Sequence, residues 1–164
     1  METKNAVNFQ IKCVVLVIFI LLFFVGYTNA GEHFSKGESV YVSIYSNVYS
    51  GVKLHVLELS GMLSIRNTDP KYSISILKAN YYDSKGELLE PYVTKPLKLK
   101  PLESTHFLVK VSDKRGGPGA KFIVKWQSDH KVNPPIIVGI MLSTRAQQGI
   151  SFICPGKIIS EHID

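Results

Sequence analysis

Apolar and polar residues alternate with a period of two along most of the chain beyond residue 37. Val40, Val42 and Ile44, for example, alternate with Tyr41, Ser43 and Tyr45. The same pattern recurs in residues 57–66, 106–111 and 121–126. A period of two places alternate side chains on opposite faces of an extended strand. The pattern therefore predicts strands with one face buried.

Turn-forming residues separate these runs. They are Asn67–Pro70, Asp83–Gly86, Pro101, Gly116–Gly119 and Asn133–Pro135. Their spacing suits seven to nine antiparallel strands, and no segment beyond residue 30 has the apolar spacing of a helix. One strand changes phase after Ile76, which predicts a bulge near Ile76–Leu77. We therefore expect an all-β protein: a single immunoglobulin-like antiparallel β-sandwich over residues 38–160, with a flexible lead at 31–37 and a tail at 161–164.

Residues 1–30 have a different pattern. A basic start is followed by an uninterrupted apolar run at 14–25 and by small residues that end at Ala30. This is the layout of a secretory signal peptide. The apolar stretch 13–27 is shorter than the roughly 18–20 residues that cross a bilayer, so we expect cleavage after Ala30. The alternative is an uncleaved anchor in the inner membrane. Both predict an exported protein, periplasmic or extracellular, that meets a membrane only through this segment.

Charge and cysteine content narrow the class of partner. The 164-residue chain has 19 basic and 13 acidic residues, a net charge of +6. The excess is scattered and too small for a nucleic-acid interface, so we expect no nucleic-acid partner. Cys154 is the only cysteine outside the signal segment, which excludes an intramolecular disulfide in the mature chain. It shares a strand face with Ile150 and Phe152, so we expect its thiol to be buried.

The sequence contains no recognisable catalytic or cofactor motif. The glycine-rich segment 115–121 lacks the order of a phosphate-binding loop and leads into a strand. Ser128, Asp129 and His130 are neighbours, whereas a triad is assembled from separate elements. The histidines form no local metal motif, although a site built from His55 or His106 with a loop aspartate stays open. We therefore assign no catalytic residue, metal or cofactor.

A polar cluster near the C-terminus, Ser143–Phe152, is the best candidate for a binding surface. Arg145 carries a planar fork of donors that matches a carboxylate such as Asp69 or Asp83. The cluster is either a structural network that satisfies loop carbonyls or a site for a ligand. The predicted surface consists of Asn67, Asp69, Asp83, Asn133, Arg145, Gln147 and Gln148. Lysines between residues 95 and 131 are either a solvated sheet face or a patch that meets an acidic polysaccharide, lipid headgroups or an acidic partner protein.

Several segments resemble a known protein family. They are Tyr45–Tyr49, Ser64–Pro70, Tyr81–Ser84, Asn133–Pro135 and Thr144–Phe152. Over roughly residues 38–159 the chain resembles the bacterial family of unknown function DUF3124. The resemblance implies an exported protein, often a lipoprotein, without an assigned activity. This chain departs from the family pattern at Asn47, where a histidine is expected, at Ala146, where a glycine is expected, and in lacking a lipobox cysteine.

These observations predict a non-catalytic binding module of the cell envelope. Its partner would be an envelope protein or an anionic envelope polymer. Two alternatives remain open. One is an envelope hydrolase in which Asp69 or Asp83 acts as acid or base while Arg145 holds an anionic group. The other is a structural subunit whose copies join through an exposed strand edge or through Cys154.

Overall fold

The computed structural model describes residues 33–50, 52–143 and 149–161. The predicted signal segment 1–30 lies outside this part of the chain. The described residues form twelve β-strands and one short 3-10 helix, η1 (Gly117–Gly119). All strand pairs are antiparallel, which confirms the predicted all-β class. In the part of the chain that is described, no helix is long and apolar enough to cross a membrane.

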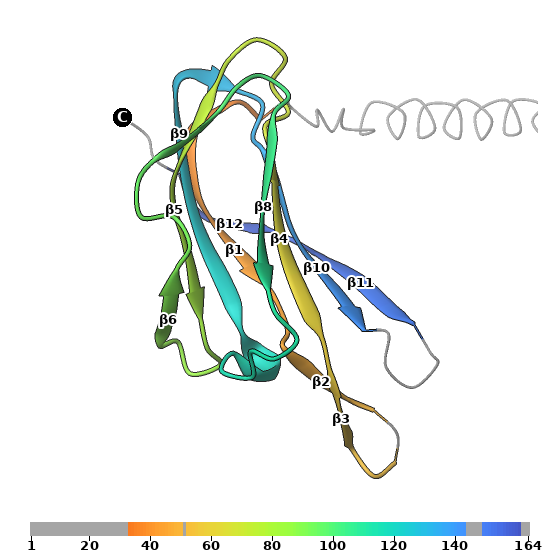
Figure 1. The fold of residues 1–164 in the computed structure, drawn as a ribbon. Helices are drawn as coiled ribbons and strands as arrows, with labels where there is room; N and C mark the ends of the chain where they lie inside the picture. Colours follow the sequence, from red (N-terminus) through yellow and green to blue (C-terminus); the bar gives the residue numbers. More distant parts are fainter. Residues whose placement is uncertain (1–32, 51, 144–148, 162–164) are drawn as a thin grey trace, which may run out of the picture. The chain divides into compact units, whose positions relative to one another are not determined.

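Two sheets face each other and form the sandwich (Figure 1). The first sheet has the order β12 (Lys157–Glu161), β1 (Ser35–Ser43), β9 (Lys121–Val132), β5 (Ile74–Tyr82) and β6 (Leu88–Pro91), with β7 (Leu97–Leu99) also paired to β5. The second has the order β11 (Ile150–Pro155), β10 (Ile136–Ser143), β4 (Ser60–Arg66) and β8 (Ser104–Val109). A separate hairpin joins β2 (Asn47–Ser50) to β3 (His55–Glu58).

The core lies between the two sheets. Phe122 and Trp126 project into it from β9, while Leu63 and Ile65 project from β4, and all four side chains are fully buried. The alternation seen in the sequence thus separates core-facing from solvent-facing residues. The predicted bulge is also confirmed, because the register between β5 and β9 shifts between Ile76 and Lys78. The shift allows apolar residues on both sides of it to face the core.

Three details differ from the sequence-based expectation. The described strands outnumber the seven to nine predicted, because β6, β7 and the β2–β3 hairpin are too short to show alternation. Strand β1 begins at Ser35, so the end of the expected lead 31–37 belongs to the sheet. Cys154 shares its face with Ile150 and Phe152 as predicted, but it is only half-buried because β11 is an edge strand. Desolvation still raises the pKa of its thiol.

Candidate functional site

Three of the predicted site residues meet at one end of the sandwich, in the β4–β5 and β9–β10 loops. The Asn67 amide donates hydrogen bonds to the carbonyls of Tyr72 and Lys100, both at 2.9 Å. Its Oδ1 accepts the Asp69 backbone N–H at 3.1 Å. Asn133 joins the cluster through its backbone N–H, which donates to Asp69 Oδ2 at 3.2 Å. The side chain of Asn67 is only 2% exposed, so it links the loops from inside.

The Asp69 carboxylate is a turn-stabilising group. Its Oδ1 accepts the backbone N–H groups of Lys71 and Tyr72, both at 2.8 Å. Burial alone would raise the pKa of Asp69, but these bonds, the bond from Asn133 and the charge of Lys71 together lower it below its usual value. An acid that is only 5% exposed and accepts three backbone donors is poorly placed to exchange protons with a substrate. This favours the structural interpretation of the cluster.

Asp83 lies at the other end of the molecule. It follows β5, whereas Asp69 precedes this nine-residue strand. Its Oδ1 accepts the backbone N–H groups of Lys85 and Glu87 within a tight turn. The bond from Glu87 contributes most to lowering the pKa of Asp83, with further backbone bonds and the nearby charge of Lys121 adding to it. Asp83 and Asp69 therefore cannot share one site.

Arg145, Gln147 and Gln148 lie outside the described residues. The flanking residues Ser143 and Ile150 are paired at the far end of β10 from Ile136, and hence from Asn133. The structure thus brings together Asn67, Asp69 and Asn133 and separates them from Asp83. Among the four predicted residues that the structure describes, Asp83 therefore lies apart from the other three.

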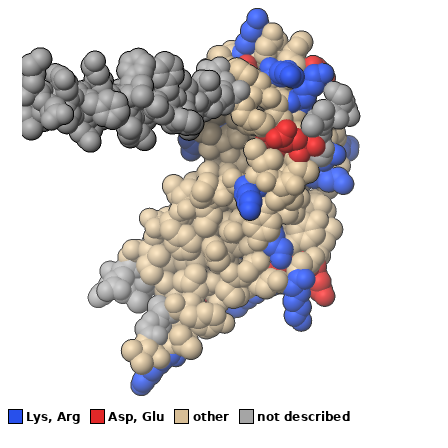
Figure 2. All heavy atoms as spheres, turned by 180° about the vertical axis from the view of Figure 1, so that it is seen from behind, with Lys and Arg blue, Asp and Glu red and all other residues tan. Residues whose placement is uncertain are grey.

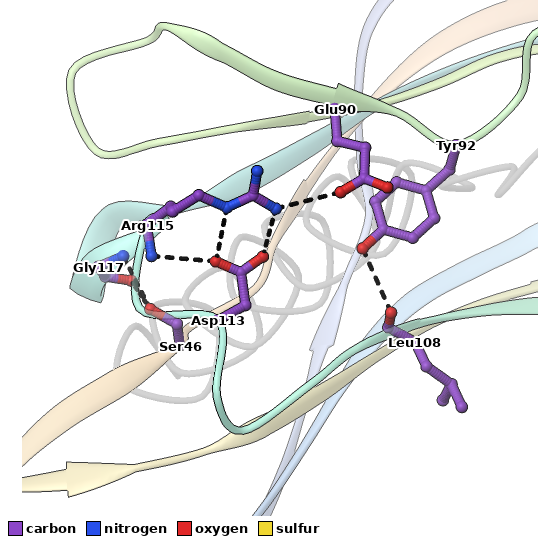
Figure 3. A network of polar contacts seen from close by, with 7 residues as sticks. All are labelled: Ser46, Glu90, Tyr92, Leu108, Asp113, Arg115 and Gly117. Atoms are coloured by element: carbon purple, nitrogen blue, oxygen red, sulfur yellow. Dashed lines mark hydrogen bonds and ion pairs between the residues drawn. The ribbon is translucent and has the colours of Figure 1, made fainter.

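A groove that sequence reasoning missed lies at the open side of the sandwich, between the edge strands β6 and β8. Its volume is about 620 Å³. It is lined by Glu90 and Tyr92 from the β6 side, Leu108 and Lys110 from β8 and its end, and Ser112, Asp113, Lys114 and Arg115 from the β8–β9 loop. Figure 3 shows the polar contacts that organise it.

Arg115 forms ion pairs with both acidic residues of this groove. Its Nε and one terminal nitrogen donate to the two oxygens of Asp113, at 3.0 and 2.7 Å. The same terminal nitrogen also donates to Glu90 Oε2 at 3.1 Å, which ties the loop to β6 (Figure 3). The pKa of Asp113 is lowered, chiefly by the hydrogen bond from Arg115. A bidentate pair of this kind fixes geometry as well as charge.

The turns around Arg115 explain its position. Asp113 Oδ1 also accepts the Arg115 backbone N–H at 3.0 Å, which closes a local Asx-type turn. The glycine-rich segment then adopts η1, and the Gly117 N–H donates to Ser46 Oγ at 2.8 Å. Gly117 has a φ of +71°, a conformation that favours glycine. The glycine-rich segment therefore anchors the groove loop to the β1–β2 connection.

An aromatic wall completes the groove. The Tyr92 ring packs edge-on against Phe107 and Phe122, with centroids 5.8 and 5.2 Å apart. Its hydroxyl donates to the Leu108 carbonyl at 3.2 Å, across the gap between β6 and β8. The groove thus presents one ring and a set of charges side by side. Within the described residues, no three metal-ligating side chains gather in a way that would hold a metal ion.

Most charges in the groove are already paired. Arg115 pairs with Asp113 and Glu90, and Lys114 pairs with Glu58 on β3. Lys110 forms no ion pair with another described residue. The sequence signal for this arrangement was weak, because Glu90 and Arg115 are 25 positions apart in the chain. Only the run of charged residues at 113–115, directly before the glycines, could have drawn attention to the loop.

Comparison with known proteins identifies a family but no activity. The model of family DUF3124, described as a protein of unknown function, matches residues 37–159. No curated protein matches the sequence. Among solved structures, the crystal structure of Thermotoga maritima 1070 is similar, with a TM-score of 0.46 and 15% sequence identity over 76% of this chain and 97% of that one.

Proposed function

We propose a binding function for this chain, which belongs to the DUF3124 family of proteins of unknown function. It acts as an exported, non-catalytic module of the cell envelope, and it holds an extended segment of a partner protein in the groove between β6 and β8. Export rests on the signal-like pattern of residues 1–30. The mass of the mature N-terminus tests this part of the proposal: cleavage after Ala30 supports it.

The observation that carries the proposal is a groove of paired charges beside a strand edge that has no strand partner in the described chain. Strand β8 is the last strand of its sheet, so the peptide groups on its outer side have no strand partner in the described chain. Such an edge can pair with an extended segment of another protein. The Leu108 carbonyl, which receives the Tyr92 hydroxyl, marks this outer side of β8.

The balance of charge favours a protein partner over an anionic polymer. The groove contains three cations, Lys110, Lys114 and Arg115, and two anions, Glu90 and Asp113. Because Lys114 and Arg115 are engaged with carboxylates, only Lys110 offers an unpaired ammonium. A polyanion binds best to several unpaired cations in a row. A polypeptide partner needs fewer unpaired cations. One of its carboxylates pairs with Lys110, an apolar side chain packs on the Tyr92 ring, and its backbone groups pair with β8.

The carboxyl groups of Asp69, Asp83 and Asp113 are poorly suited to act as general acids. A general acid that works near neutral pH needs a raised pKa. The pKa values of Asp69, Asp83 and Asp113 are all lowered. Asp113 is also held by the Arg115 fork, which keeps its oxygens engaged. The hydrolase alternative therefore lacks an acid of suitable strength among these residues.

Site-specific photo-crosslinking in cells tests the groove. The photoreactive residue p-benzoylphenylalanine replaces Ser112, which lines the groove, and in a control it replaces Lys98 on β7. We expect one protein adduct from position 112 that is absent from position 98. Lys110→Ala should weaken this adduct several-fold, while Lys78→Ala, which removes the same charge from β5, should leave it unchanged. Equal adducts from both positions, or none from position 112, would contradict the proposal.

A further inference from the structure

The outer face of the first sheet carries a polar cavity at its loop end, with a volume of about 270 Å³. Outward residues of three neighbouring strands line it, since Lys98 on β7 lies opposite Ser75 on β5, and Ser75 lies opposite Gln127 on β9. The β4–β5 loop and the end of β9 supply the other lining residues, which are Lys71, Tyr72, Ser73, Ser128, Asp129 and His130. The lining therefore combines charges, hydroxyls, an amide and aromatic rings, and it includes no aliphatic side chain.

The buried Asn67–Asp69 cluster holds the loop that forms one wall of this cavity. Asp69 Oδ1 accepts the backbone N–H groups of Lys71 and Tyr72, and the Asn67 amide donates to the Tyr72 carbonyl. The Tyr72 ring stacks on the His130 ring, with centroids 4.2 Å apart. Lys71 Nζ lies 5.2 Å from the centroid of the Tyr72 ring. Because the backbone of this wall is already fixed, a ligand does not have to order it on binding.

An irregularity in β9 forms the opposite wall. Strands β1 and β9 stay in register up to Gln127 and resume at Val132, so residues 128–131 of β9 lie opposite a single residue of β1. A bulge of this kind redirects side chains from their regular alternation. Ser128 Oγ donates to the Ser73 carbonyl at 2.9 Å, which fastens the bulge to the β4–β5 loop. Both walls of the cavity are therefore tied to each other and to the sheet.

The cations in and beside the cavity are unpaired. Among the described residues, no ion pair involves Lys71 or Lys98. Lys78 and Lys125 lie opposite each other in the next row of β5 and β9, and neither forms an ion pair with a described residue. Figure 2 shows Lys and Arg side chains gathered at the upper end of the sandwich, where the β4–β5 loop lies in Figure 1. Several unpaired cations on one face attract a polyanion, which the paired charges of the β6–β8 groove do not.

We propose that this face binds an acidic polysaccharide and that the cavity holds one of its carboxylated sugar units. Lys71 and Lys98 pair with the sugar carboxylate. Ser75 and Gln127 exchange hydrogen bonds with the sugar hydroxyls. Asp129, the one carboxylate among the lining residues, repels a simple anion but accepts hydrogen bonds from hydroxyls. The mixed lining therefore favours an acidic sugar over free phosphate.

The second row of cations favours a polymer over a single sugar. Lys125 precedes Gln127 by two residues on β9, so the two rows are about 7 Å apart along the strand. The sugar unit that follows the bound one can therefore reach Lys78 and Lys125. The cavity is also smaller than the roughly 300–1,000 Å³ of pockets that enclose a whole ligand, so it takes one unit while the chain continues over the sheet. It shares no lining residue with the groove, and this inference does not depend on the groove ligand.

Equilibrium binding of fluorescein-labelled oligogalacturonate, an oligomer of carboxylated sugars, tests the site. The protein is expressed from its full sequence and used as the cell processes it, and binding is followed by fluorescence anisotropy. We expect saturable binding that unlabelled oligogalacturonate displaces and neutral dextran does not. Lys71→Ala combined with Lys98→Ala should weaken it about tenfold. Lys53→Ala combined with Lys85→Ala removes the same charge from exposed turns elsewhere and should leave the affinity unchanged.

A neutral substitution and three competitors separate sugar recognition from general attraction between charges. Gln127→Ala changes no charge, and its loss of a hydrogen bond to a hydroxyl should weaken binding about threefold to fivefold. Polyglutamate, inorganic phosphate and phosphatidylglycerol vesicles should displace the label only at higher concentrations than unlabelled oligogalacturonate does. Stronger displacement by any of the three would overturn the proposal in favour of an acidic protein, a simple anion or a lipid surface. Absence of binding, or equal weakening by the two double variants, would overturn it as well.

Discussion

Replacing Asn67 by alanine tests whether the loop-end cluster is a structural network or a binding site. The Asn67 side chain makes three well-formed hydrogen bonds, to the carbonyls of Tyr72 and Lys100 and from the Asp69 N–H. Each such bond contributes about 1 kcal/mol net, and a buried group left without a partner costs about 1–3 kcal/mol. We therefore expect Asn67→Ala to lower the free energy of unfolding by about 3 kcal/mol.

Asn133→Ala is the matched control. Asn133 lies in the same cluster, but it contributes its backbone N–H, which alanine retains. Its side chain makes no hydrogen bond to another described residue, so this substitution should cost no more than about 0.5 kcal/mol. The two variants therefore separate the contribution of the buried amide from that of the loop itself.

Urea unfolding followed by circular dichroism measures both variants. For a domain of this size, with a slope of about 1.5 kcal/mol per molar urea, a loss of about 3 kcal/mol shifts the midpoint by about 2 M. The Asn133→Ala midpoint should stay within about 0.3 M of the wild type. If Asn67→Ala unfolds within about 0.5 M of Asn133→Ala, the hydrogen bonds do not support the fold. The network interpretation would then be wrong.

Three further predictions follow from single contacts. The pKa of Asp69 in the folded protein lies below 3.8, its value in the unfolded chain. The stability that the carboxylate contributes is therefore complete above pH 3.8 and is lost as the pH falls through the folded pKa. Thermal melts of Asp69→Asn should depend less on pH below about 4 than those of the wild type. The buried Tyr81 hydroxyl has no hydrogen-bond partner among the described residues, so urea unfolding of Tyr81→Phe should show unchanged or slightly raised stability. A Cβ at Gly139 would lie 2.5 Å from the Ser43 carbonyl oxygen, so Gly139→Ala should lower the free energy of unfolding by about 1–3 kcal/mol in the same assay.

The strands were predictable because the alternation that defines them is local. A two-residue period is written into the sequence wherever one face of a strand is buried, and the phase change at Ile76 indicated the bulge for the same reason. Strands of three or four residues, such as β7, are too short for a period to be read. Their existence depends on neighbouring strands, which the sequence does not show.

The candidate surface was predictable only in part. Successive turns of an antiparallel sheet lie at alternate ends, so Asp69 before β5 and Asp83 after it must be far apart. Counting the strands between these turns would have placed Asp69 and Asp83 at opposite ends of the sheet. The residues of the candidate surface were instead chosen because they are polar. The Arg115–Glu90 contact could not be read this way, since it depends on how close the edges of two different sheets come. Tertiary packing alone determines that distance.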